Sequence, residues 1–66
     1  MRIQLNGEPR DLPGPINVRD LLTALGIDAR VVAVELNRAV VKRARHADTM
    51  VLEGAEVEIV AFVGGG

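Results

Sequence analysis

Alternating apolar and polar side chains predict a β-hairpin at the start of the chain. Residues 1–6 alternate with the period of two that is typical of a half-buried strand. The dipeptide at 6–7 is Asn-Gly, the strongest short signal for a tight hairpin turn. We therefore expect a second strand over residues 8–12. Pro9 places it at an edge of the sheet, because proline cannot donate a ladder hydrogen bond.

A short amphipathic helix is predicted between Asn17 and Gly26. Asn17 is a favourable N-cap, and Asp20 stands three positions later, where it resembles the acidic partner of a capping box. Gly26 fits the left-handed C′ position, and Ile27 is placed for the hydrophobic contact of a Schellman motif. The apolar face recurs at helical spacing through Val18, Leu21, Leu22 and Leu25.

The second half of the chain begins with two predicted strands. Residues 31–36 are β-branched and apolar enough for a strand in the interior of a sheet. A turn at 37–38 leads from it into a strand over residues 39–43, which we expect to pair antiparallel with the first.

The last strand is predicted over residues 56–63, after a turn at 53–55. Its outer face changes from charged to apolar along its length, which is unusual for a monomer. We interpret Val60, Phe62 and Val63 as an apolar docking surface for a partner. The alternative is that Phe62 folds over the sheet edge into the core. The inner face holds Val57, Ile59 and Ala61, and the outer face holds Glu56, Glu58, Val60 and Phe62.

The order of elements is strand, strand, helix, strand, strand, strand, with a crossing segment over residues 44–52 before the last strand. We expect a short helical turn in this segment, anchored by Met50 and Leu52. This order predicts an α+β fold with a sheet of four to five strands packed on one main helix. It predicts a single domain over 1–63, followed by a flexible C-terminal glycine tail over 64–66.

The composition favours a small protein without covalent staples. The chain has 66 residues and no cysteine, which excludes disulfides and thiolate metal ligands. No apolar run reaches the ~20 residues of a membrane span, and no signal segment is visible, so we expect a cytoplasmic protein with no membrane partner. A net charge of −1 argues against a general polyanion partner.

A basic cluster between residues 38 and 46 is the one feature that suggests nucleic acid. Stacking of bases needs several aromatic side chains, and Phe62 is the only aromatic residue. We therefore interpret the cluster as solvated or partner-facing charge and expect no nucleic-acid partner. Its members are Arg38, Lys42, Arg43, Arg45 and His46.

No self-contained catalytic or metal site is visible. His46 is the only histidine, with Asp48 two residues away, whereas a zinc site needs three or four ligands. We interpret His46 as a solvated loop histidine. Serine is absent, and Thr23 and Thr49 have no base of their own. We expect a protein that is not an enzyme and that binds no metal or cofactor itself.

The remaining chemistry lies at the end of the sequence. Gly64, Gly65 and Gly66 follow the last strand directly and form a thin thread that fits a narrow channel. A carboxylate at Gly66 resists nucleophiles until a partner, using ATP and Mg²⁺, converts it into a mixed anhydride with AMP. A sulfur nucleophile then displaces AMP and leaves a thiocarboxylate. The alternative is a frayed terminus without function.

The order of elements and the glycine end resemble the ubiquitin-like β-grasp fold and, within it, the ThiS family of sulfur carriers for thiazole formation in thiamine biosynthesis. The motifs that carry the resemblance are V-E-L-N at 34–37, V-E-I-V at 57–60 and F-V-G-G-G at 62–66, with V-R-D-L-L at 18–22. The resemblance covers essentially the whole chain.

This resemblance implies a role as protein co-substrate. Gly66 would be adenylylated by a ubiquitin-activating-like enzyme of the ThiF type and then thiocarboxylated, with Gly64 and Gly65 threaded into the partner. A thiazole synthase of the ThiG type would take the sulfur, and a cysteine desulfurase or rhodanese-type protein would donate it. The chain departs from the family pattern at 42–43 and 53–55, both away from the tail. A carrier for molybdopterin synthesis or tRNA thiolation, and a non-covalent β-grasp binding module, are the alternatives.

Overall fold

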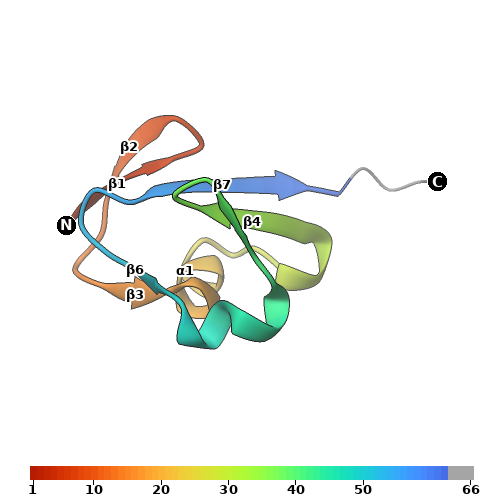
Figure 1. The fold of residues 1–66 in the computed structure, drawn as a ribbon. Helices are drawn as coiled ribbons and strands as arrows, with labels where there is room; N and C mark the ends of the chain where they lie inside the picture. The colour runs from red at the N-terminus through yellow and green to blue at the C-terminus, as the bar shows by residue number, and fades with distance from the viewer. Residues whose placement is uncertain (63–66) are drawn as a thin grey trace.

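The computed structural model describes residues 1–62 and shows a mixed β-sheet with one α-helix against it (Figure 1). Five strands form the main sheet in the order β2-β1-β7-β4-β5, and β3 pairs with β6 in a separate two-stranded sheet. The predicted α+β class and the sheet of four to five strands are confirmed. In chain order the elements are β1 (Arg2–Leu5), β2 (Glu8–Asp11), β3 (Ile16–Asn17), α1 (Val18–Ala24), the 3₁₀ helix η1 (Ala29–Val31), β4 (Val32–Leu36), β5 (Ala39–Val41), the 3₁₀ helix η2 (Arg43–Asp48), β6 (Met50–Val51) and β7 (Glu56–Ala61).

The last strand is the centre of the main sheet. β7 lies between β1, with which it runs parallel, and β4, with which it runs antiparallel. The parallel pairing requires a long crossover, which the chain makes through α1 and the elements that follow it. β4 is an interior strand as predicted, because β5 pairs with its other edge. The C-terminal end of β7 lies at the opposite end of the molecule from the N-terminus (Figure 1).

Both ends of α1 are set by the residues that the sequence predicted. The Asn17 side chain accepts a hydrogen bond from the Asp20 backbone N–H at 2.7 Å, which satisfies a free donor of the first turn. Gly26 has a φ of 72°. The Ile27 N–H donates to the Leu22 carbonyl at 2.9 Å and the Gly26 N–H to the Thr23 carbonyl at 3.0 Å, which is the bond pair of a Schellman motif.

Two asparagines at tight turns fasten β7 from both sides. The Asn6 side chain accepts from the Ile59 N–H at 2.7 Å and donates to the Ile59 carbonyl at 3.2 Å, so it imitates a strand residue where β1 has ended. The Asn37 side chain accepts from the Glu56 N–H at 2.9 Å. Asn37, the last residue of the V-E-L-N motif, therefore has a structural role at the start of β7.

The turn after β4 holds an arginine in the left-handed region. Asn37 and Arg38 have φ values of 50° and 71°, whereas the β1–β2 turn has Asn6 at 51° and a glycine, Gly7, at 82°. Left-handed backbone costs a non-glycine residue roughly 1–2 kcal/mol. The 3.8 Å ion pair of Arg38 with Glu56 offsets little of this, because both side chains are mostly exposed.

We predict that Arg38→Gly stabilises the fold. The relief of strain outweighs the extra chain entropy of glycine, so we expect the free energy of unfolding to rise by about 0.5–1 kcal/mol and the melting temperature by roughly 2–8 °C. The measurement is a thermal melt. Ala39→Gly is the control, since Ala39 lies in β5 and glycine only weakens a strand there. A lower melting temperature for Arg38→Gly would show that Arg38 stabilises the turn.

The core lies between α1 and the inner face of the main sheet. Ile3 of β1, Val34 of β4 and Val57 of β7 are each 1% exposed, and they pack in one cluster with residues of α1. No helix within residues 1–62 is long and apolar enough to cross a membrane. In the described part of the chain, the buried apolar residues are Ile3, Val18, Leu21, Leu22, Val32, Val34, Val51, Ala55 and Val57.

The crossing segment is anchored differently from the prediction. Its helical turn is present as η2, but Met50 and Leu52 are 47% and 55% exposed, so the expectation that they anchor it is wrong. Val51 between them is fully buried. The reason is the pairing of β6 with β3, in which Val51 lies opposite Ile16 and turns toward the core.

Two predicted strands are also shorter than expected. Val31 belongs to η1, and β4 begins at Val32. β5 ends at Val41, so the prediction that it continues through Arg43 is wrong. Lys42 instead precedes η2, which begins at Arg43 and leads the chain over α1.

Candidate functional site

The predicted reactive end of the chain follows β7. Phe62 is the last described residue, and its N–H donates to the Val31 carbonyl at 2.9 Å, which carries the β4–β7 pairing one step past Ala61. The residues predicted for docking, threading and modification beyond this point are outside the described residues. They are Val63, Gly64, Gly65 and Gly66.

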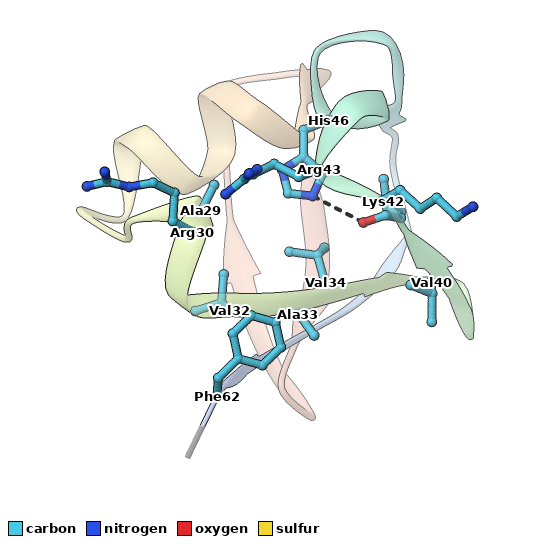
Figure 2. A pocket seen from close by; sticks show the side chains of 11 residues that line it. Ala29, Arg30, Val32, Ala33, Val34, Val40, Lys42, Arg43, His46 and Phe62 are labelled. Atoms are coloured by element: carbon cyan, nitrogen blue, oxygen red, sulfur yellow. Dashed lines mark hydrogen bonds between the residues drawn. The ribbon is translucent and has the colours of Figure 1, made fainter. Parts of the chain in front are cut away.

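An apolar patch lies on the outer face of the sheet beside this end. Phe62 and Val60 are 61% and 57% exposed, so the alternative that Phe62 folds into the core is wrong. Val60 pairs with Ala33 of β4, and Figure 2 shows the Phe62 ring beneath the Ala33 end of β4. Val40 of β5, 72% exposed, extends the apolar surface across the sheet. We call these four residues, Ala33, Val40, Val60 and Phe62, the outer patch.

Carboxylates adjoin the outer patch on the same face. Glu58 lies directly opposite Glu35 on the neighbouring strand. Like charges in this position repel each other in the free protein. Glu56, at the start of β7, has a carboxylate oxygen 3.8 Å from the Arg38 guanidinium. The outer face of β7 therefore changes from acidic to apolar toward Phe62, and this surface fits a partner with an apolar recess flanked by cations.

The sequence analysis found only half of the outer patch. Val60 and Phe62 were identified by alternation within one strand. Ala33 and Val40 were missed, because Ala33 lies opposite Val60 through the register of β4 with β7, and Val40 reaches the same face through the register of β5 with β4. A signal was available for Ala33: it alternates with the buried Val32 and Val34 and therefore belongs to the outer face.

The interpretation of His46 as a solvated histidine is wrong, because its side chain is buried. Its Nε2 lies 3.1 Å from the Val41 carbonyl oxygen. A carbonyl can only accept, so Nε2 is the donor and the hydrogen bond ties η2 to the end of β5 (Figure 2). The Nδ1 atom is buried and has no hydrogen-bond partner among residues 1–62. No local pattern indicates this burial, because η2 packs on α1 only in the folded chain.

The other basic residues of the predicted cluster are all exposed. Arg38 contacts Glu56 on the outer face, and the exposed side chains of Lys42, Arg43 and Arg45 have no ion pair among the described residues. Nearby, the hydrogen-bonded side chain of Arg30 lowers the pKa of Asp28 to about 2. Asp28 is therefore ionised at neutral pH and holds Arg30 at 2.8 Å.

The part of the chain that the structure describes has no group of three or more histidine, cysteine, aspartate or glutamate side chains that could hold a metal ion. His46 points to the Val41 carbonyl, and the hydroxyls of Thr23 and Thr49 donate to the backbone carbonyls four residues before them at 3.1 Å and 2.7 Å. None of these groups is arranged with a base or an acid. The candidate site is therefore the outer patch together with the chain end that it precedes.

Known proteins similar to this chain fall into two groups by length. The chain matches the ThiS family over residues 3–66. It is 40% identical to the thiamine biosynthesis protein ThiS of Geobacter metallireducens, whose crystal structure superimposes with a TM-score of 0.89 and full coverage of both chains. It is 36% identical to the sulfur carrier protein ThiS of Thermus thermophilus, covering 97% of this chain and 98% of that one.

Longer proteins match as well. The thiazole synthase of Paramagnetospirillum magneticum is 44% identical over all of this chain, and that of Magnetococcus marinus is 41% identical. The chain spans only about 20% of the length of these two curated relatives. The matches over almost the whole chain in the first group settle the family, and this chain belongs to the ThiS family.

Proposed function

We propose that the chain carries sulfur as a thiocarboxylate on Gly66 and donates it to thiazole formation. The observation that carries this proposal is the family match, which continues through residue 66 and so includes the three glycines after β7. Glycines present no side chain to a partner's channel, and their carbonyl carbon is not shielded by a Cβ.

The chemistry proceeds in two steps on partner enzymes. A carboxylate oxygen of Gly66 attacks the α-phosphate of ATP, held with Mg²⁺ by a ThiF-type adenylyltransferase, and pyrophosphate leaves. A sulfur nucleophile from a cysteine desulfurase or rhodanese-type donor then attacks the carbonyl carbon, and the bond to AMP breaks. If the donor is a persulfide, a thiol must cleave the remaining S–S bond to release the thiocarboxylate. We place this chemistry in the cytoplasm, where ATP is available.

The acceptor that we propose is a thiazole synthase of the ThiG type. Two proteins named thiazole synthase contain a stretch similar to all of this chain, which supports a working association of the two units. The outer patch supplies a surface next to the tail on which the activating enzyme and the acceptor could dock in turn, through Val60, Phe62 and the adjoining Val63.

The intact mass of the protein tests the proposal. We expect the mass of one oxygen-to-sulfur exchange after incubation with ATP, Mg²⁺, a ThiF-type enzyme and a sulfur donor, and no change when ATP is omitted. Fragmentation should place the exchange on Gly66. An exchange on a side chain, an unchanged mass, or a native polypeptide that continues past Gly66 without being cleaved there would contradict the carrier proposal.

A further inference from the structure

β4 is longer than β5, the edge strand beside it. It spans Val32–Leu36, but its pairing with β5 begins only at Val34, opposite Val41. The same register continued would place Lys42 beside Ala33 and Arg43 beside Val32, but the chain turns into η2 there. Within residues 1–62, the first two residues of β4, Val32 and Ala33, therefore have no strand partner on the β5 side.

The backbone of Val32 is directed at this free edge. In an antiparallel sheet, alternate residues turn their N–H and C=O groups to opposite neighbours. Val31 and Asn37 both bond to the β7 side, at 2.9 Å to Phe62 and 2.7 Å to Glu56. Residues 32 and 34 therefore face away from β7. Val34 meets Val41 there, whereas Val32 meets no strand. An unpaired edge of this kind is a template for an added strand.

A cavity of about 310 Å³ opens at the free edge (Figure 2). It reaches from the buried side of β4 at Val32 and His46 to the outer face at Phe62, so an apolar side chain entering it would be covered on two sides. The His46 side chain forms part of the cavity wall, and its Nδ1 atom has no hydrogen-bond partner among the described residues. We call this cavity the edge groove, and the lining residues used below are Val32, Ala33, Lys42, Arg43, His46 and Phe62.

The charges at the edge groove are positive. Lys42 and Arg43 are exposed and have no ion pair in the described part of the chain. Arg30, which also lines the cavity, is already held by Asp28 at 2.8 Å. A second copy of this chain pairing through the same edge would bring two sets of these cations together, which disfavours a homodimer. Charge complementarity instead favours an acidic occupant.

We propose that the edge groove binds an extended, acidic segment of a partner protein, which adds to the free edge of β4 as a further strand. Its main chain would pair with Val32, and its side chains would alternate between the two faces of the strand. Apolar side chains on one face of the added strand would enter the cavity against Val32, and the carboxylates that alternate with them would meet Lys42 and Arg43. The proposal does not depend on the chemistry of the tail, so its failure would leave the carrier proposal unaffected.

The probe is a blocked hexapeptide of alternating glutamate and valine, titrated into the full ¹⁵N-labelled chain and followed by NMR. We expect amide shifts to change mainly at residues 32–34 and 42–43. The double variant Lys42→Glu, Arg43→Glu should weaken binding roughly tenfold, because two attractive contacts become repulsive. Arg45→Glu is the matched control, since Arg45 is exposed on η2 but does not line the edge groove, and it should change the affinity less than about twofold.

Two N-methylated peptides test the strand pairing itself. One is methylated at the valines and the other at the glutamates, because alternate N–H groups of an added strand point to opposite sides. We expect one peptide to lose binding and the other to keep it; any other pattern overturns strand addition. The proposal is also overturned if the unmodified peptide does not bind or if its shifts map to the outer patch alone. Binding that appears only after residues 64–66 are deleted would identify the chain's own end as the occupant and overturn it as well.

Discussion

Deleting Gly65 and Gly66 is expected to abolish thiocarboxylate formation and leave the melting temperature within about 2 °C of the full chain. Within residues 1–62 the buried residues all lie between Ile3 and Val57, and the deletion removes no part of this core. Two glycines contribute no side-chain surface to bury. The chemistry depends on position, however: the new carboxylate at Gly64 would lie roughly 7 Å short of the reactive place in the partner.

A chain extended by one alanine after Gly66 is the matched control. It keeps all three glycines but moves the carboxylate forward by roughly 3.5 Å and places a Cβ beside it. We expect it to be nearly as inactive as the deletion, with an unchanged melt. A thermal melt and the intact-mass assay are run on all three proteins. Normal sulfur loading of the extended chain would show that the terminus is not the reacting group, and a much earlier melt of the truncated chain would show that the tail stabilises the fold.

The features that the sequence predicted well are those decided within a few neighbouring residues. The N-cap at Asn17 and the left-handed Gly26 each depend on one turn of backbone, and both are present as predicted. The Asn6-Gly7 hairpin depends only on two residues that accept positive φ. The helix and the strands of the main sheet follow from periodicity, which reports burial on one face.

The errors concern segments whose environment is made by distant parts of the chain. Residues 50–52 read Met-Val-Leu, an apolar run in which periodicity does not tell which side chain faces inward. Only the pairing of β6 with β3 makes Val51 the buried one. His46 is buried for the same kind of reason, because η2 packs on α1 and lies close to the end of β5.

The candidate site was predictable to the extent that it lies on one strand. Alternation alone placed Val60 and Phe62 outward, and both are exposed. The edge groove was beyond sequence reasoning, because the same alternation continued β5 through Arg43 and would have filled the edge. What ends β5 is the course of η2 over α1, a tertiary contact with no local signal.

Phe62→Asp is expected to weaken binding of the ThiF-type enzyme by roughly 10- to 100-fold. Phe62 is 61% exposed in the free chain, so more than half of its surface is available for burial by a partner. Burying a phenylalanine contributes about 1.5–3 kcal/mol, and an aspartate would place an unpaired charge in the same recess. The fold should tolerate the change with a loss below about 1 kcal/mol, because little of the ring is buried and the Phe62 N–H that pairs with Val31 is kept.

The matched control is Leu52→Asp. Leu52 is 55% exposed, close to the value for Phe62, but it follows β6 and precedes the start of β7, whereas Phe62 follows the end of that strand. It should leave affinity unchanged, and Phe62→Leu should restore most of the binding, because an apolar side chain is again present. Affinity is measured by calorimetry with ATP omitted, and stability by a thermal melt. If Phe62→Asp unfolds the protein, the ring is needed for the stability of the fold and is not a free docking group. Equal losses of affinity for Phe62→Asp and Leu52→Asp would show that the outer patch is not where the enzyme docks.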